Sequence, residues 1–144
     1  MNLVSHDAAQ VPRDELRSLL AHAVWPPTAD RAGVVLQETY GRPGVTLYLM
    51  MEGRDVLGLI GLRRTGGDSG EITHIAVDPR RRLHGVGQHM VAEVRRIESL
   101  RILVAETDSD AVGFYRRCGF EVAHLGEKYP GVDRFLCTYR EPEA

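Results

Sequence analysis

The sequence predicts a single α/β domain, a mixed sheet covered by helices. Two apolar stretches at 46–51 and 56–62 are separated by Glu-Gly-Arg-Asp, which is typical of a β-hairpin. A strand at 71–77, rich in β-branched residues, extends this antiparallel set. The second half alternates strand with helix, a pattern that favours helices packed on a sheet. The 144 residues contain no linker, repeat or low-complexity segment, so one domain is expected.

The remaining elements follow from apolar spacing and from helix-breaking residues. In the N-terminal third we expect a strand at 2–5, a helix at about 13–24, a break at Pro26-Pro27 and a helix at about 29–38. In the second half we expect a helix at 86–99, a strand at 102–105, a helix at 110–117, and strands at 121–125 and 135–139.

The segment from Pro79 to Gly87, PRRRLHGVG, has the composition of an anion-binding site. It lies between the strand at 71–77 and an amphipathic helix whose apolar residues recur at spacings of three and four. Gly85 and Gly87 therefore stand where this helix begins. The first backbone N–H groups of a helix have no partner within it, and glycines allow a phosphate to approach them closely.

Composition narrows the class of protein. The formal net charge of −2 and the pI near 6.3 provide no overall basic field, so nucleic-acid binding is not expected. No apolar run reaches the length of a membrane span, and the first residues lack a signal-peptide pattern, so we expect a cytoplasmic protein. Cys118 and Cys137 show no metal-ligand spacing, which predicts neither a zinc site nor a disulfide framework.

Two motifs resemble the GNAT superfamily of N-acetyltransferases. The first contains Arg82, Gly85 and Gly87, which match the family's acetyl-CoA motif Gln/Arg-x-x-Gly-x-Gly/Ala. The second, at 108–120, resembles the family's Asn-x-x-Ala, Phe/Leu-Tyr and Gly-Phe pattern, with Asp108 where many members have asparagine. Both occur in the family's order and spacing within residues 71–125. An aspartate there can still accept hydrogen bonds and cap the following helix, but it cannot donate an amide N–H.

The resemblance implies a GNAT fold, with a mostly antiparallel sheet that splays between its fourth and fifth strands. Acetyl-CoA, with no metal, would lie between the strands at 71–77 and 101–107. Its pyrophosphate would bind the amides of 83–88, and its pantetheine arm would pair with the main chain of 75–77. The implied cofactor-binding residues are Ile75, Ala76, Val77, Arg82, Leu83, His84, Gly85, Val86, Gly87, Gln88, Asp108 and Tyr115.

The resemblance also implies how an amine would attack the thioester. Tyr115 would act as the general acid that protonates the departing thiolate, and Glu71 would act through water as the general base. In a regular strand, Glu71 and Thr73 lie on one face and His74 lies on the other. His74 has a suitable pKa but the unfavourable face, and Glu106 on the neighbouring strand is the reserve candidate, with bulk water as a further alternative.

Several charged residues near these motifs have less certain roles. Arg80 and Arg81 are expected to be solvated loop charges, whereas Arg116 and Arg117 could contact the 3′-phosphate of CoA. The C-terminal stretch 125–135 is similar to the tail of a group of bacterial GNAT proteins. It would border the acceptor site with three polar residues, Tyr129, Asp133 and Arg134.

Alternatives from other classes were weighed against this interpretation. A Rossmann dinucleotide domain is disfavoured because Met90 occupies the position of the third glycine. A noncatalytic CoA-binding sensor of the same fold stays open. Nucleic-acid binding would need more basic and aromatic residues than the arginine cluster offers. The expected acceptor is an amine of a small molecule or a peptide, and the expected assembly is a monomer or a homodimer.

Overall fold

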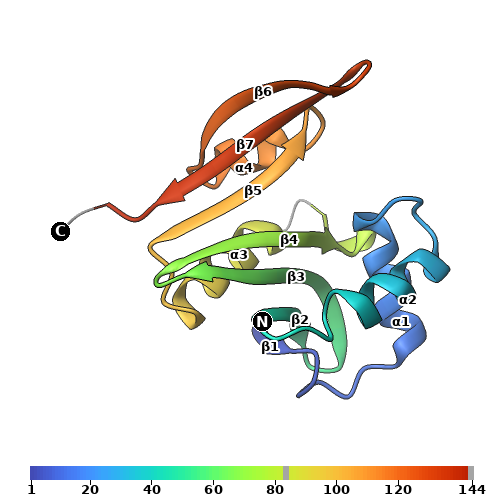
Figure 1. Cartoon of the computed structure of the whole chain (residues 1–144). Helices are drawn as coiled ribbons and strands as arrows, with labels where there is room; N and C mark the ends of the chain where they lie inside the picture. The colour runs from blue at the N-terminus through green and yellow to red at the C-terminus, as the bar shows by residue number, and fades with distance from the viewer. Residues whose placement is uncertain (83–84, 143–144) are drawn as a thin grey trace.

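A computed structural model describes residues 1–82 and 85–142 and contains one seven-stranded sheet (Figure 1). The strand order is β1-β2-β3-β4-β5-β7-β6. All neighbouring strands are antiparallel except β4 and β5, which are parallel. The strands are β1 (Asn2–Ser5), β2 (Val45–Glu52), β3 (Asp55–Gly66), β4 (Ser69–Val77), β5 (Ile102–Asp108), β6 (Glu121–Tyr129) and β7 (Val132–Arg140). The predicted mixed sheet is confirmed.

The helices match the sequence prediction with two shorter boundaries. The α-helices are α1 (Arg13–Leu20), α2 (Ala29–Glu38), α3 (Val86–Ile97) and α4 (Val112–Arg117), and the 3₁₀ turns are η1 (Ala21–Ala23) and η2 (Pro79–Arg81). The first predicted helix therefore ends at Leu20 and continues as η1. Thr28 caps α2 by accepting a hydrogen bond from the Arg31 N–H at 3.1 Å. None of the helices in this described part of the chain is long and apolar enough to span a membrane.

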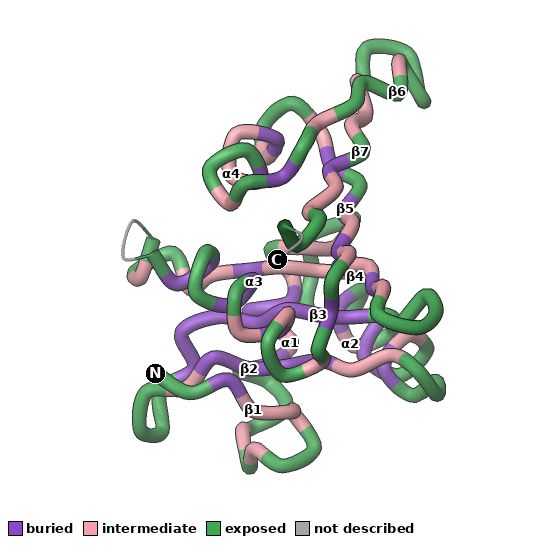
Figure 2. Tube along the Cα trace, turned by 90° about the vertical axis from the view of Figure 1, so that its left-hand side faces the viewer, coloured by how far each residue is buried: buried purple, intermediate pink, exposed green. Residues whose placement is uncertain are grey.

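Two hydrophobic cores lie on opposite faces of the sheet. Helices α1 and α2 cover one face, where Leu20, Leu47 and Leu59 are fully buried. Helices α3 and α4 cover the other face, around residues such as Met90 and Leu103. Figure 2 shows the buried residues concentrated in β2 and β3, the strands that lie between these two layers. The prediction of helices on both faces is confirmed.

The sheet splits between β4 and β5. The two strands pair only at Ser69 with Ile102, Gly70 with Leu103 and Glu71 with Val104. Beyond these pairs β5 continues beside β7 as far as Asp108, while β4 continues beside β3 as far as Val77. Figures 1 and 2 show β5, β7 and β6 diverging from the rest of the sheet. One edge of β4 is therefore left without a strand partner after Glu71, at the position that the family resemblance implies.

A β-bulge in β4 changes which side chains share a face. His74 pairs with Gly61 and Ile72 pairs with Leu62, so Thr73 has no partner on β3. Ile72 and Ile75 consequently pack in the same core beside α3, although their sequence separation is odd. The predicted alternation is therefore wrong from Thr73 onward. His74 lies on the α1/α2 face, the same face as Glu71, instead of on the opposite one.

Candidate active site

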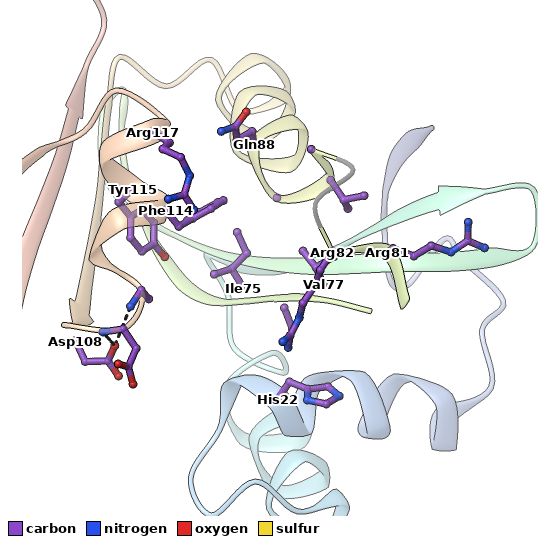
Figure 3. Close-up of a pocket in the computed structure, with 16 residues that line it drawn as sticks. His22, Ile75, Val77, Arg81, Arg82, Gln88, Asp108, Phe114, Tyr115 and Arg117 are labelled. Carbon is purple, nitrogen blue, oxygen red and sulfur yellow. Dashed lines mark hydrogen bonds between the residues drawn. The ribbon is translucent and has the colours of Figure 1, made fainter. Parts of the chain in front are cut away.

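A pocket of about 820 Å³ lies where β4 and β5 diverge, between the start of α3, the start of α4 and the turn η1 (Figure 3). Every predicted cofactor-binding residue that the structure describes lines it: Ile75, Ala76, Val77, Arg82, Gly85, Val86, Gly87, Gln88, Asp108 and Tyr115. Predicted residues Leu83 and His84 lie outside the described residues. The pocket also includes residues that the sequence analysis did not select, His22, Asp110, Ala111 and Phe114.

The start of α3 has the geometry of an anion site. Gly85 is the N-cap residue with φ of 74°, in the left-handed region that favours glycine. A β-carbon on Gly87 would lie 2.7 Å from the Phe114 ring, so only glycine fits there without a shift of α4. The first N–H groups of α3 have no acceptor within the helix and lie at the pocket wall, where they can bind a phosphate group.

The arginines around this loop have different environments. Arg80 is bound to Asp78, whose carboxylate it contacts at 2.8 Å, and these hydrogen bonds lower the pKa of Asp78 to about 2. Arg81 lines the pocket and lies 3.7 Å from Asp55. Within residues 1–82 and 85–142, neither Arg82 nor Arg117 forms an ion pair, and Figure 3 shows both at the pocket. These two side chains are the cations best placed for the phosphates of a ligand.

Tyr115 lies at the inner end of the pocket. Its side chain is 4% exposed, and its ring packs edge-on against Phe114 and Phe120, with centroid distances of 5.1 and 5.3 Å. Burial raises the pKa of Tyr115 well above its ordinary value, with smaller contributions from Cys137 and Cys118, so the phenol keeps its proton at neutral pH. Its hydroxyl makes no hydrogen bond to any described residue, and it is therefore available to a ligand.

Asp108 forms the cap that its residue type predicts. Its Oδ1 accepts hydrogen bonds from the N–H groups of Asp110 at 3.0 Å and Ala111 at 3.1 Å. These bonds hold residues 110 and 111 in a turn, which is why α4 begins at Val112, two residues later than predicted. One oxygen satisfies both amides, so this turn does not require the N–H of an asparagine.

Replacing Asp108 with alanine should lower the free energy of unfolding by about 1 kcal/mol, because two amide donors lose their acceptor. Replacing it with asparagine should keep the stability within about 0.5 kcal/mol, since the amide oxygen can accept the same bonds. Urea denaturation of both variants measures this difference. Equal losses in the two variants would contradict the capping role.

The two predicted carboxylate bases are both engaged with cations. Glu71 accepts a hydrogen bond from Arg63 at 3.0 Å and is not among the residues that line the pocket. Glu106 accepts hydrogen bonds at 3.2 Å from Lys128 and from Arg134, and these two contacts lower the pKa of Glu106. Of the other tail residues, Tyr129 is exposed at the end of β6, and Asp133 pairs with His124 at 2.9 Å.

A third constellation on β4 was not predicted. The Tyr40 hydroxyl lies 2.7 Å from Thr73 Oγ1 and 2.6 Å from His74 Nδ1. Gly61 makes room for it, because a β-carbon at this position would overlap the Tyr40 hydroxyl and Thr73 Oγ1. No sequence signal connects Tyr40 to residues more than thirty positions away, and a strand read as regular separates Thr73 from His74.

Comparisons with known proteins agree with this geometry. Residues 43–122, more than half of the chain, match the family described as the acetyltransferase (GNAT) domain. The chain therefore belongs to the GNAT acetyltransferase family. An uncharacterized N-acetyltransferase in the lysA 3′ region of Bacillus methanolicus is 35% identical over 81 residues. This match covers 56% of the chain and 64% of that relative, which is less than two thirds of its length.

Solved structures share the fold at low sequence identity. A GNAT-family protein from Desulfovibrio desulfuricans has a TM-score of 0.72 and 23% identity, covering 96% of this chain and 98% of that chain. An aminoglycoside 6′-N-acetyltransferase complexed with coenzyme A has a TM-score of 0.80 and 17% identity, covering 100% of this chain and 99% of that chain. These likenesses establish the fold. The acceptor of this chain has to be inferred from its own residues.

Proposed function

We propose that this chain transfers the acetyl group of acetyl-CoA to a primary amine of a small molecule or a peptide. The observation that carries the proposal is the pocket that joins the N–H groups at the start of α3 to the Tyr115 hydroxyl across the split in the sheet. A phosphate-bearing thioester needs an anion site at one end and a proton donor at the other. The coenzyme A complex of the structurally similar aminoglycoside acetyltransferase supports the same choice of cofactor.

The residues present fit the cofactor along its length. Arg82, Arg117 and the amides at the start of α3 would hold its phosphates. The free edge of β4 beyond Glu71 would accept main-chain hydrogen bonds from the pantetheine amides, as if the arm were an added strand. Gly85 and Gly87 leave room for the backbone to approach the pyrophosphate.

The chemistry would be direct attack of the amine on the thioester carbonyl. As the C–S bond breaks, the thiolate takes the proton of the Tyr115 hydroxyl, which is neutral at physiological pH and has no competing acceptor among the described residues. The amine must first lose its own proton to a base. Glu71 acting through water is the base that the family resemblance implies, and it lies on the α1/α2 face of β4.

The acceptor would reach the thioester from the α1/α2 face, because α3 and α4 enclose the other side of the pocket. The surroundings of this approach include charges of both signs, Glu71 with Arg63 and Glu106 with Lys128 and Arg134. This mixed lining gives no strong preference for a polycation. An amine that also carries a hydroxyl or carboxyl group would find partners in it.

The decisive experiment is an acetyl-CoA turnover screen with purified protein, read by release of free thiol. Aminoglycosides, polyamines, amino acids and peptides with free N-termini represent the acceptor classes, and product mass confirms the added acetyl group. We expect thiol release that depends on one amine class. Binding of acetyl-CoA by calorimetry with no turnover for any amine would favour a sensor domain, and absence of binding would overturn the proposal.

A further inference from the structure

The bulge in β4 directs two successive side chains, Thr73 and His74, toward the hydroxyl of Tyr40. The Tyr40 oxygen lies 2.7 Å from Thr73 Oγ1 and 2.6 Å from His74 Nδ1, and Tyr40 is buried, with 8% of its surface exposed. These contacts fix the imidazole at one nitrogen. Nε2 makes no hydrogen bond to any described residue, and it is absent from the fully buried unpaired atoms. The imidazole is therefore oriented at Nδ1 and accessible at Nε2.

We infer that His74, oriented by Tyr40 and Thr73, is the base that takes the proton from the acceptor amine. This inference rests on the acetyl transfer proposed above. His74 lies on the α1/α2 face of β4, beyond the last pair that β4 makes with β5 and next to Ile75, which lines the cofactor pocket. It therefore stands on the face from which the amine would approach.

The carboxylates near the split are less suited to this task. The Arg63 guanidinium is 3.0 Å from Glu71, and Glu106 is contacted by both Lys128 and Arg134. A carboxylate neutralised by a cation holds a proton weakly. The Nδ1 partner of His74 is instead a neutral hydroxyl, so its free nitrogen keeps its basicity.

The groups that face His74 favour its neutral form. Burial lowers the pKa of His74 and the charge of Arg31 on α2 lowers it further, so the imidazole is unprotonated at neutral pH. Tyr40 also stays uncharged, because burial raises the pKa of its phenol. The remaining charged neighbours on this face of the sheet are Glu71 of β4 and Arg63 of β3, which neutralise each other.

One arrangement of protons leaves His74 ready to act. Nδ1–H donates to the Tyr40 oxygen, and the Tyr40 O–H donates to Thr73 Oγ1, so the lone pair of Nε2 is free. The ammonium group of the acceptor gives one proton to Nε2, and the resulting amine attacks the carbonyl carbon. The new C–N⁺ centre then loses a proton to solvent, the C–S bond breaks, and the thiolate is protonated by Tyr115. Overall, an ammonium ion and a thioester give an amide, a thiol and one proton.

The test is the pH dependence of kcat/KM for the full chain with whichever amine the screen identifies. We expect an acid limb with a midpoint below about 6.5, set by His74. His74→Gln should lower kcat/KM by at least about 100-fold at neutral pH and remove this limb. Tyr40→Phe should shift the limb and lower kcat, with no change in the KM for acetyl-CoA, because the ring remains but the hydroxyl that orients the imidazole is lost.

Three comparisons keep the inference falsifiable. His89→Gln, an exposed histidine outside the pocket, should leave the profile unchanged. If the limb persists in His74→Gln but is lost in His22→Gln or Glu71→Gln, the base is the other residue and the inference is overturned, although acetyl transfer stands. NMR titration of the imidazole in wild type and Tyr40→Phe gives a readout independent of turnover. An unchanged His74 pKa in Tyr40→Phe would contradict the orienting role. No turnover by wild type with any amine would instead refute the proposed function.

Discussion

Replacing Tyr115 with phenylalanine should lower kcat by about 100- to 10,000-fold, the range that a positioned general acid contributes. The substitution removes only the hydroxyl, which makes no hydrogen bond to the described residues, while the ring keeps its edge contacts with Phe114 and Phe120. The affinity for acetyl-CoA and the free energy of unfolding should therefore be unchanged. Single-turnover kinetics, calorimetry and urea denaturation measure the three quantities separately.

Tyr139→Phe provides a matched control for the loss of a phenol outside the pocket. Tyr139 lies on β7, with its ring beneath the Arg95 guanidinium at 3.8 Å, and it does not line the pocket. Its removal should leave kcat unchanged. If Tyr115→Phe retains the wild-type kcat while acetyl-CoA still binds, Tyr115 has no part in the chemistry and solvent protonates the thiolate.

Replacing Gly61 with alanine should lower the free energy of unfolding by about 2–4 kcal/mol and reduce turnover as well. The added β-carbon would overlap the Tyr40 hydroxyl and Thr73 Oγ1 and would lie 2.6 Å from Tyr40 Cζ. Tyr40 must therefore move away from β4, and its hydrogen bonds to Thr73 and His74 break. Thermal and urea denaturation give the stability change, and the pH profile shows whether His74 has lost its orientation.

Two further variants separate this mechanism from a general cost of alanine. Gly113→Ala, on α4, would place its β-carbon 3.4 Å from the end of the Arg117 side chain, so its stability should stay within about 1 kcal/mol of wild type. In a Tyr40→Ala background, Gly61→Ala should cost less than it does alone, because the overlapping hydroxyl is gone. Additive losses in this double-mutant cycle would show that Tyr40 is not the reason for the glycine.

Local sequence patterns were sufficient for most of the fold and for the cofactor side of the site. The glycines and Arg82 lie within a few residues of the strand and helix that position them, so their spacing alone places them together. The cap at Asp108 could be predicted for the same reason, because its partners are two and three residues away.

The acceptor side depends on contacts that spacing does not encode. The bulge at Thr73 inverts the alternation of β4, and only the register with Gly61 and Leu62 reveals it. Tyr40, Thr73 and His74 meet because the end of α2 packs over β3, which brings together residues more than thirty positions apart. The cations that engage Glu71 and Glu106 come from other strands, β3, β6 and β7, so those pairings were also out of reach.

The three residue pairs that join β4 to β5 also bear on how the domain holds together when it unfolds. The strands β5, β7 and β6 share a continuous ladder among themselves, yet the sheet connects them to the other half through this short junction. A ligand that lies along the free edge of β4 and contacts α4 spans both halves. Because binding to the folded state alone adds RT ln(1 + [L]/Kd), about 2.7 kcal/mol at 100 times Kd, the cofactor would act as a cohesive element. The same gap that admits the substrate thus makes the cooperativity of unfolding depend on whether it is filled.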